Sequence, residues 1–266
     1  MSFFWVPFKY SFATRIKKAS TKVSFFITFF LPVFVLSYCS AISQVDFNHQ
    51  VDFFMAFLLL FFALFLVYEI GYIYNDFHTT RFEKNPTIRL SLEEIKYFEK
   101  SYPIHVAIRL ILALLFVFLA NTYYEINVPS FLLLLSLLNL SYSLHNYYRG
   151  DENLLTIFLL LVFKYLSVPL AFVFEFNLNI FVNLFGFIFL FPLVRTIIFS
   201  THDKISYDIM SKNNMTKFRL IYFFLSSMTL YLLSISNEIF STLTYISIGF
   251  MLFYMLGFIL ERKNKL

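Results

Sequence analysis

Long apolar runs alternate with short polar segments along the whole chain. Each of the eight runs is about 20 residues long, the length that a helix needs to cross a bilayer. The pattern predicts an all-α polytopic membrane protein that forms one domain over residues 1–266. The predicted spans cover about 23–43, 52–74, 104–121, 129–147, 153–174, 178–200, 218–235 and 239–260.

Composition supports this class of protein. Hydrophobic residues make up 59% of the chain and charged residues 14%, with a mean hydropathy of +0.73. A soluble domain of this size needs more polar surface, so the composition excludes one. The 40 phenylalanines are expected to face lipid. The net charge of +5 is explained by basic membrane loops and does not indicate a nucleic-acid partner.

Lys and Arg residues occupy alternate loops, which predicts the orientation. The loops near Asp46, Glu125, Asn177 and Asn237 contain no Lys or Arg. An even number of spans with both termini in the cytoplasm accounts for this asymmetry. The basic residues of the other side include Lys9, Arg15, Lys17, Arg81, Lys84, Arg89, Arg149, Lys204, Lys212, Arg262 and Lys263.

Two features of the third span are predicted from local signals. Segment 91–102, "SLEEIKYFEKSY", reads as a short separate amphipathic helix with Ser91 as its N-cap, and Pro103 stands at the entry to the span. Arg109 lies near the cytoplasmic end of the span, so we expect its charged end to reach the membrane surface.

The second apolar run ends in the crowded polar stretch "EIGYIYNDFHTTRFEKNPTIRL", residues 69–90. If the helix continues through this stretch, several polar side chains fall within an arc of about 80°, with Asn75 beside them. Carboxylates on one face need a cation, and Mg²⁺ is a common one. A solvated helix end is the alternative, but it leaves Glu69 inside the apolar run. The residues of the arc are Glu69, Tyr72, Asp76, Thr79 and Glu83.

Two further polar features lie elsewhere. The loop after the sixth span contains Asp203, Lys204 and Asp208, on the same predicted side of the membrane as Asp76. Lys164 lies near the middle of the fifth span, where a lysine is costly unless it faces a polar interior. Lys164 is expected either to pair with an acid such as Glu69 or to bind a phosphate.

The order of these motifs resembles the UbiA superfamily of intramembrane aromatic prenyltransferases. Asn75, Asp76, Thr79 and Glu83 occupy the positions of that family's Asn-Asp-x-x-Asp-x-x-x-Asp motif. Other positions also match in kind: Pro86, Arg89, Tyr142, Ser143, Arg149, Asp203, Asp208 and Thr216. Thr79 and Glu83 replace aspartates of the family motif, and the family usually has nine spans where this chain has eight.

The resemblance implies an isoprenoid diphosphate bound through Mg²⁺ in a central cavity, with its apolar tail among Phe and Leu side chains. It assigns Asp76, Glu83, Asp203 and Asp208 to the metal. It assigns Asn75, Arg89, Arg149, Lys164 and Lys204 to the diphosphate. Asp76, Asp203, Glu69 and Tyr72 are the residues expected to act in the reaction, the last two near the acceptor.

Other functions remain open from the sequence. One branch of the superfamily transfers phosphoribose from a sugar diphosphate to a polyprenyl phosphate, and that chemistry uses the same acids and bases. A catalytically degenerate homologue is supported by Thr79, and a transporter by Glu69, Arg109 and Lys164. The composition is typical of an AT-rich bacterial genome, which predicts the bacterial cytoplasmic membrane as the location.

Overall fold

The computed structural model describes residues 6–42, 50–82, 87–148, 153–203 and 212–263, and at 200–203, 212–214 and 260–263 it describes the backbone alone. Contacts within the chain define two compact units, Met1–Glu175 and Phe176–Leu266. Each unit is treated by itself below.

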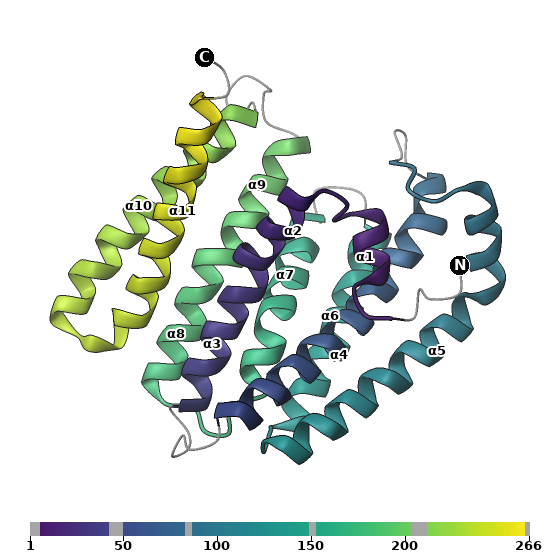
Figure 1. Cartoon of the computed structure of the whole chain (residues 1–266), viewed down its shortest axis with the longest axis horizontal. Coiled ribbons are helices and arrows are strands. Elements are labelled where there is room, and N and C mark those ends of the chain that lie inside the picture. The colour runs from purple at the N-terminus through teal and green to yellow at the C-terminus, as the bar shows by residue number, and fades with distance from the viewer. Residues whose placement is uncertain (1–5, 43–49, 83–86, 149–152, 204–211, 264–266) are drawn as a thin grey trace. The chain divides into compact units, whose positions relative to one another are not determined.

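The described residues are helical almost throughout and include no β-strand (Figure 1). The first unit contains α1 (Lys9–Thr14), α2 (Ala19–Phe25), a π-helical turn (Phe26–Phe30), α3 (Leu31–Ile42), α4 (Gln50–Phe77), α5 (Leu92–Tyr123), α6 (Val128–Tyr147) and α7 (Asn153–Leu170). The second unit contains α8 (Leu178–Ile188), a π-helical turn (Phe189–Leu193), α9 (Val194–Asp203), α10 (Lys212–Ser236) and α11 (Ser241–Lys263).

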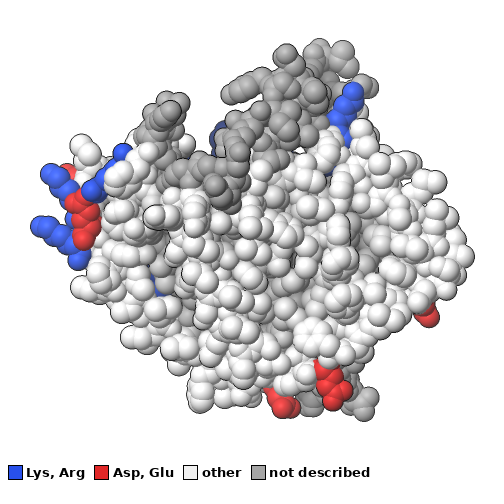
Figure 2. Space-filling model, turned by 180° about the vertical axis from the view of Figure 1, so that it is seen from behind, with Lys and Arg blue, Asp and Glu red and all other residues white. Residues whose placement is uncertain are grey.

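Eight helical segments in the described ranges are long and apolar enough to cross a membrane, which confirms the predicted fold class. Most of the described surface visible in Figure 2 consists of uncharged side chains. The protein is therefore a multi-pass helical membrane protein. The segments are Ala19–Ile42, Gln50–Phe77, Leu92–Tyr123, Val128–Tyr147, Asn153–Leu170, Leu178–Phe199, Met215–Ser236 and Glu238–Ile259.

Helix α4 is the centre of the first unit. It contacts α5 most extensively and also packs against α6 and α7. Consecutive residues from Ala63 to Gly71 are buried, so this part of α4 is enclosed on all sides. A helix that is apolar all round is suited to such a position. Polar groups on α4 must therefore find partners inside the protein.

Helix α5 differs from the prediction at Pro103. We expected a short amphipathic helix and then a separate span, but Leu92–Tyr123 is one continuous helix with Pro103 inside it. Pro103 is exposed, and the segment before it is anchored by Phe98, which is fully buried against Tyr10, Ile73 and Phe77. Such packing can hold a helix together across a proline. The predicted N-cap is confirmed, because Ser91 and Glu94 form a reciprocal capping box.

Helix α4 is shorter than predicted, because the polar face from Glu69 to Glu83 would require a helix that continues to residue 83. It stops at Phe77, and a 3₁₀ turn follows over Thr79–Phe82. The hydroxyls of Thr79 and Thr80 donate to the carbonyl oxygens of Asn75 and Asp76, four residues back. Threonine competes in this way for backbone acceptors at helix ends. The continuous helical face from Glu69 to Glu83 was therefore a wrong prediction beyond Asp76.

In the second unit, α10 packs along α11, and aromatic side chains fill the space around them. The ring of Phe250 lies 4.8 Å from that of Phe191 and 5.3 Å from that of Phe223, measured between centroids.

Candidate functional site

The N-terminal segment folds back onto α4, a feature that sequence reasoning did not find. Phe8 has a positive φ of 65° and stacks its ring on Phe65, with centroids 4.1 Å apart. This turn places α1 against α4 (Figure 1). Tyr10 on α1 is fully buried. The sequence showed only a basic segment before the first span, because neither the turn at Phe8 nor its partner on α4 leaves a local signal.

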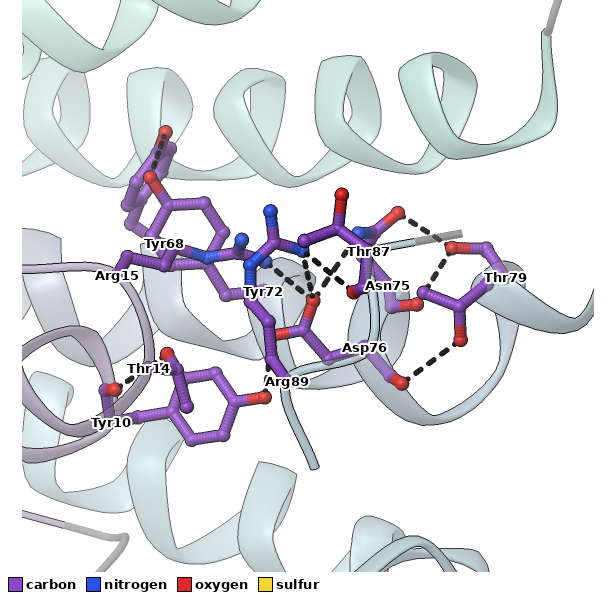
Figure 3. A network of polar contacts seen from close by, with 11 residues as sticks. Tyr10, Thr14, Arg15, Tyr68, Tyr72, Asn75, Asp76, Thr79, Thr87 and Arg89 are labelled. Atoms are coloured by element: carbon purple, nitrogen blue, oxygen red, sulfur yellow. Dashed lines mark hydrogen bonds and ion pairs between the residues drawn. The ribbon is translucent and has the colours of Figure 1, made fainter. Parts of the chain in front are cut away.

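Asp76 is the most heavily bonded acid in this region. Its carboxylate accepts hydrogen bonds from the Tyr10 hydroxyl at 2.8 Å, from Arg15 Nη2 at 2.8 Å and from Arg89 Nη1 at 3.2 Å. The Asp76 side chain is fully enclosed, and Figure 3 shows both guanidinium groups converging on it. Two cations thus share one anion, which leaves a positive charge at this point.

Aromatic side chains extend this group of contacts. The guanidinium of Arg15 lies 3.9 Å from the ring centroid of Tyr72, whose hydroxyl lies 3.2 Å from that of Tyr68. We call this set the Asp76 cluster; its members are Tyr10, Arg15, Tyr68, Tyr72, Asp76 and Arg89. Cation–π contact and ion pairing together hold Arg15 in place, and ion pairing holds Arg89.

Tyr10 lies outside the membrane spans and stays protonated in the cluster. Burial, and next the neighbouring carboxylate of Asp76, raise the pKa of the Tyr10 hydroxyl far above its usual value. The phenol therefore donates its proton to the hydrogen bond with Asp76 across the physiological pH range.

Lys164 borders the cluster. It is buried, and its ammonium lies 3.9 Å from the ring centroid of Tyr68 and 4.5 Å from that of Phe29. The predicted polar interior around this lysine is thus largely a cage of aromatic rings, which stabilise a cation through their negative faces.

The cationic partner of Glu69 is Arg109, and not Lys164 as the sequence suggested. Its carboxylate accepts a hydrogen bond from Arg109 Nη1 at 3.0 Å and another from the backbone N–H of Ser11 at 2.6 Å. Both charged side chains are fully buried, and Arg109 also donates to the carbonyl oxygen of Leu66. The expectation that Arg109 reaches the membrane surface was wrong, because α5 packs closely on α4 and turns Arg109 inward.

The motif positions of the resemblance are only partly described. Thr79 donates to Asn75 Oδ1 at 2.6 Å, and Asn75 Nδ2 lies 3.4 Å from Asp76 Oδ1, so three of the four positions form a hydrogen-bonded chain. The remaining predicted residues Glu83, Arg149, Lys204 and Asp208 lie outside the described residues, and only the backbone of Asp203 is described.

The described residues do not form a magnesium site on their own. No group of three His, Cys, Asp or Glu side chains comes together among them. The one carboxylate of the Asp76 cluster is already neutralised by Arg15 and Arg89. The chemistry of this donor set suits a phosphate anion, since arginine binds phosphate oxygens with paired donors.

Comparison of the chain with protein-family models, with curated proteins and with solved structures found no match.

Proposed function

We propose that this protein is a membrane transferase of the UbiA type that binds the phosphate end of an isoprenoid substrate at the Asp76 cluster. The reaction would pass a prenyl group from an isoprenoid diphosphate to a small acceptor. The proposal rests on one observation: two arginines are held beside a single buried carboxylate at the end of an apolar helix.

Unused donors on these arginines support an anionic ligand. A guanidinium carries five N–H donors, and Asp76 uses only part of those on Arg15 and Arg89. Nε of Arg15 is buried and has no hydrogen-bond partner within the described parts of the chain. A buried unpaired donor is costly, and a phosphate oxygen would satisfy it.

The surroundings suit the other end of the substrate. Phe61, Phe65 and Phe29 pack against one another along α4 and the first span, close to Lys164 and Tyr68. An isoprenoid tail beside these rings would meet surroundings as apolar as the lipid that it comes from.

From these positions we propose roles in the reaction. As the bond between the allylic carbon and the diphosphate oxygen breaks, the leaving diphosphate keeps the electron pair. Arg15 and Arg89 would stabilise the added charge by hydrogen bonds. The acceptor then forms a bond to the allylic carbon and releases a proton. Mg²⁺ would neutralise the diphosphate further if it binds through the acids that are not described, Glu83 and Asp208 among them.

A second candidate is phosphoribosyl transfer to a polyprenyl phosphate. It is favoured by the cations at the Asp76 cluster, because Arg15 and Arg89 both pair with the one carboxylate of that cluster. Such an excess of positive charge suits two phosphorylated substrates.

An assay with purified protein in lipid nanodiscs separates these possibilities. One set contains prenyl diphosphates and acceptors, the other contains phosphoribosyl diphosphate and a polyprenyl phosphate, each with Mg²⁺ or with a chelator. Labelled product in the first set but not in the second supports prenyl transfer. Labelled product in the second set but not in the first supports phosphoribosyl transfer. Product in neither set contradicts the transferase proposal and leaves the degenerate homologue or the transporter.

The matched pair Arg15→Gln and Lys17→Gln tests the site. Lys17 is exposed and lies two residues from Arg15, so its loss should leave activity unchanged. Loss of Arg15 removes donors at the leaving group, and we expect a fall of about 100-fold in kcat, as for other transition-state donors. Equal activity of the two variants would show that Arg15 does not contact substrate.

A further inference from the structure

A cavity of about 410 Å³ lies between α4, the start of α5 and α6, apart from the Asp76 cluster. Ile70, Gly71 and Tyr74 line it from α4. At 100° per residue these three positions centre about 170° away from Glu69, Tyr72 and Asp76, so the cavity and the cluster occupy opposite faces of α4. Its volume is in the range of small-molecule sites.

Helix α6 supplies a polar edge to this cavity. Asn139, Ser143 and Asn146 all line it, and their spacing of four and three residues places them on one face of the helix. The rest of α6 is rich in leucine, so a stripe of two amides and a hydroxyl is costly there unless it has polar partners. The Ser143 hydroxyl donates to the carbonyl oxygen of Asn139 and keeps its lone pairs for a ligand.

Tyr142 forms the wall between the cavity and the Asp76 cluster. Its ring centroid lies 5.4 Å from that of Tyr68 and 5.9 Å from that of Tyr72, and the residue also lines the cavity. The ring fits against α4 because residue 71 is glycine; a Cβ at Gly71 would lie 2.4 Å from the Tyr142 ring. The close approach keeps the cavity separate from the arginines.

The lining restricts the chemistry of a ligand. No Lys, Arg, Asp or Glu is among the described residues that line the cavity, so a cationic ligand would meet no carboxylate there and an anionic ligand no Lys or Arg. His78 also lines it, and its buried Nδ1, which has no hydrogen-bond partner among the described residues, can pair with a hydroxyl group. A purely apolar ligand would leave the amides of Asn139 and Asn146 without partners. Flat ring surfaces are supplied by Tyr74 and Tyr102. We infer that the cavity binds an uncharged ring compound with several hydroxyl groups, such as a sugar.

Cysteine protection tests this inference without any assay of transfer. In a Cys39→Ser background, Ser143→Cys places a thiol at the cavity and Ser136→Cys places one seven residues away on the same helix. Both serines are exposed, and each donates to the carbonyl oxygen four residues back, but only Ser143 lines the cavity. The measurement is the rate of modification by N-ethylmaleimide in nanodiscs free of sugar detergents.

The probes are free glucose, galactose, mannose and N-acetylglucosamine in one arm, and a glucosyl diacylglycerol in the nanodisc in the other. At a sugar concentration of about twice Kd, modification at position 143 should slow about threefold, with no change at position 136. Protection in the lipid arm alone identifies a glycolipid headgroup, and protection in both arms identifies a site open to free sugars.

Absence of protection in both arms, or equal protection at positions 136 and 143, would overturn the inference. Slower modification with dodecyl phosphate but not with sugar would overturn it as well, because the ligand would then be anionic. As a second variant, Asn146→Leu keeps the branched shape of the side chain and removes the amide. We expect it to abolish protection at position 143, with a thermal unfolding transition that shows the protein is still folded.

Discussion

Glu69 and Arg109 form a fully buried ion pair inside an apolar helix bundle. A charge in such a place costs several kcal/mol unless a partner and hydrogen bonds compensate it. The backbone N–H of Ser11 supplies one of those hydrogen bonds. The sequence predicted that Glu69 faces the interior, but not its partner, because 40 residues separate the two and Arg109 alone looked like a surface residue.

Glu69→Gln should lower the free energy of unfolding by about 3–5 kcal/mol, because it leaves Arg109 buried without its counter-charge. Glu99→Gln is the matched control, since Glu99 pairs with Arg81 at an exposed site and should change stability by less than about 1 kcal/mol. Unfolding by SDS in mixed micelles measures both. If both variants lose less than about 1 kcal/mol of unfolding free energy, the Glu69–Arg109 pair is hydrated rather than buried.

Gly71→Ala should also destabilise the protein, by about 1–3 kcal/mol, because the new methyl group overlaps the Tyr142 ring and one of them must move. Gly249→Ala is the control: nothing lies within 4 Å of a Cβ there, so the better helix propensity of alanine should leave stability equal or raise it by up to about 1 kcal/mol. The same unfolding measurement compares them, and a neutral Gly71→Ala would refute close packing of Tyr142.

At the scale of elements, helix existence was predictable and helix ends were not. Apolar runs predicted every span, and Ser91 predicted the start of α5 through its capping chemistry. The predicted helix boundary at Pro103 and the predicted continuation of α4 after Phe77 were both wrong. At Pro103 the packing of Phe98 holds one helix together, and after Phe77 threonine hydroxyls take backbone acceptors. Neither cause can be read from a local pattern.

Ser91→Ala should cost about 1 kcal/mol and should speed hydrogen exchange of the amides at the start of α5, including that of Glu94. Ser101→Ala removes a serine from the same helix that bonds only to the carbonyl oxygen of Tyr97, and we expect no change at residues 92–95. Exchange measured by mass spectrometry distinguishes them; equal exchange in both variants would contradict the role of the cap.

At the scale of the whole chain, composition and spacing were sufficient for the class of protein, whereas the site depended on contacts between distant segments. Asp76 was named from its motif, but Tyr10 and Arg15 reach it across more than 60 residues. The basic N-terminal segment had been interpreted as an orientation signal only. A sequence offers no local sign that such a segment also supplies side chains to an interior site.

The distribution of Lys and Arg predicts that both chain ends face the cytoplasm. A reporter that is active only in the cytoplasm should therefore work when fused after Leu266 and when fused before Met1. Fusion in the loop near Asn177, which contains no Lys or Arg, should silence it. Opposite behaviour of the two ends would require an odd number of spans.

The pairing of Glu69 with Arg109 also bears on how the chain enters the membrane. During synthesis, Glu69 leaves the ribosome 40 residues before Arg109 does. Of the two partners that Glu69 has in the folded protein, Ser11 and Arg109, only Ser11 has been synthesised in that interval. The second and third spans should thus leave the translocation channel together as a helical hairpin, because release of the second span alone would place an uncompensated acid in lipid.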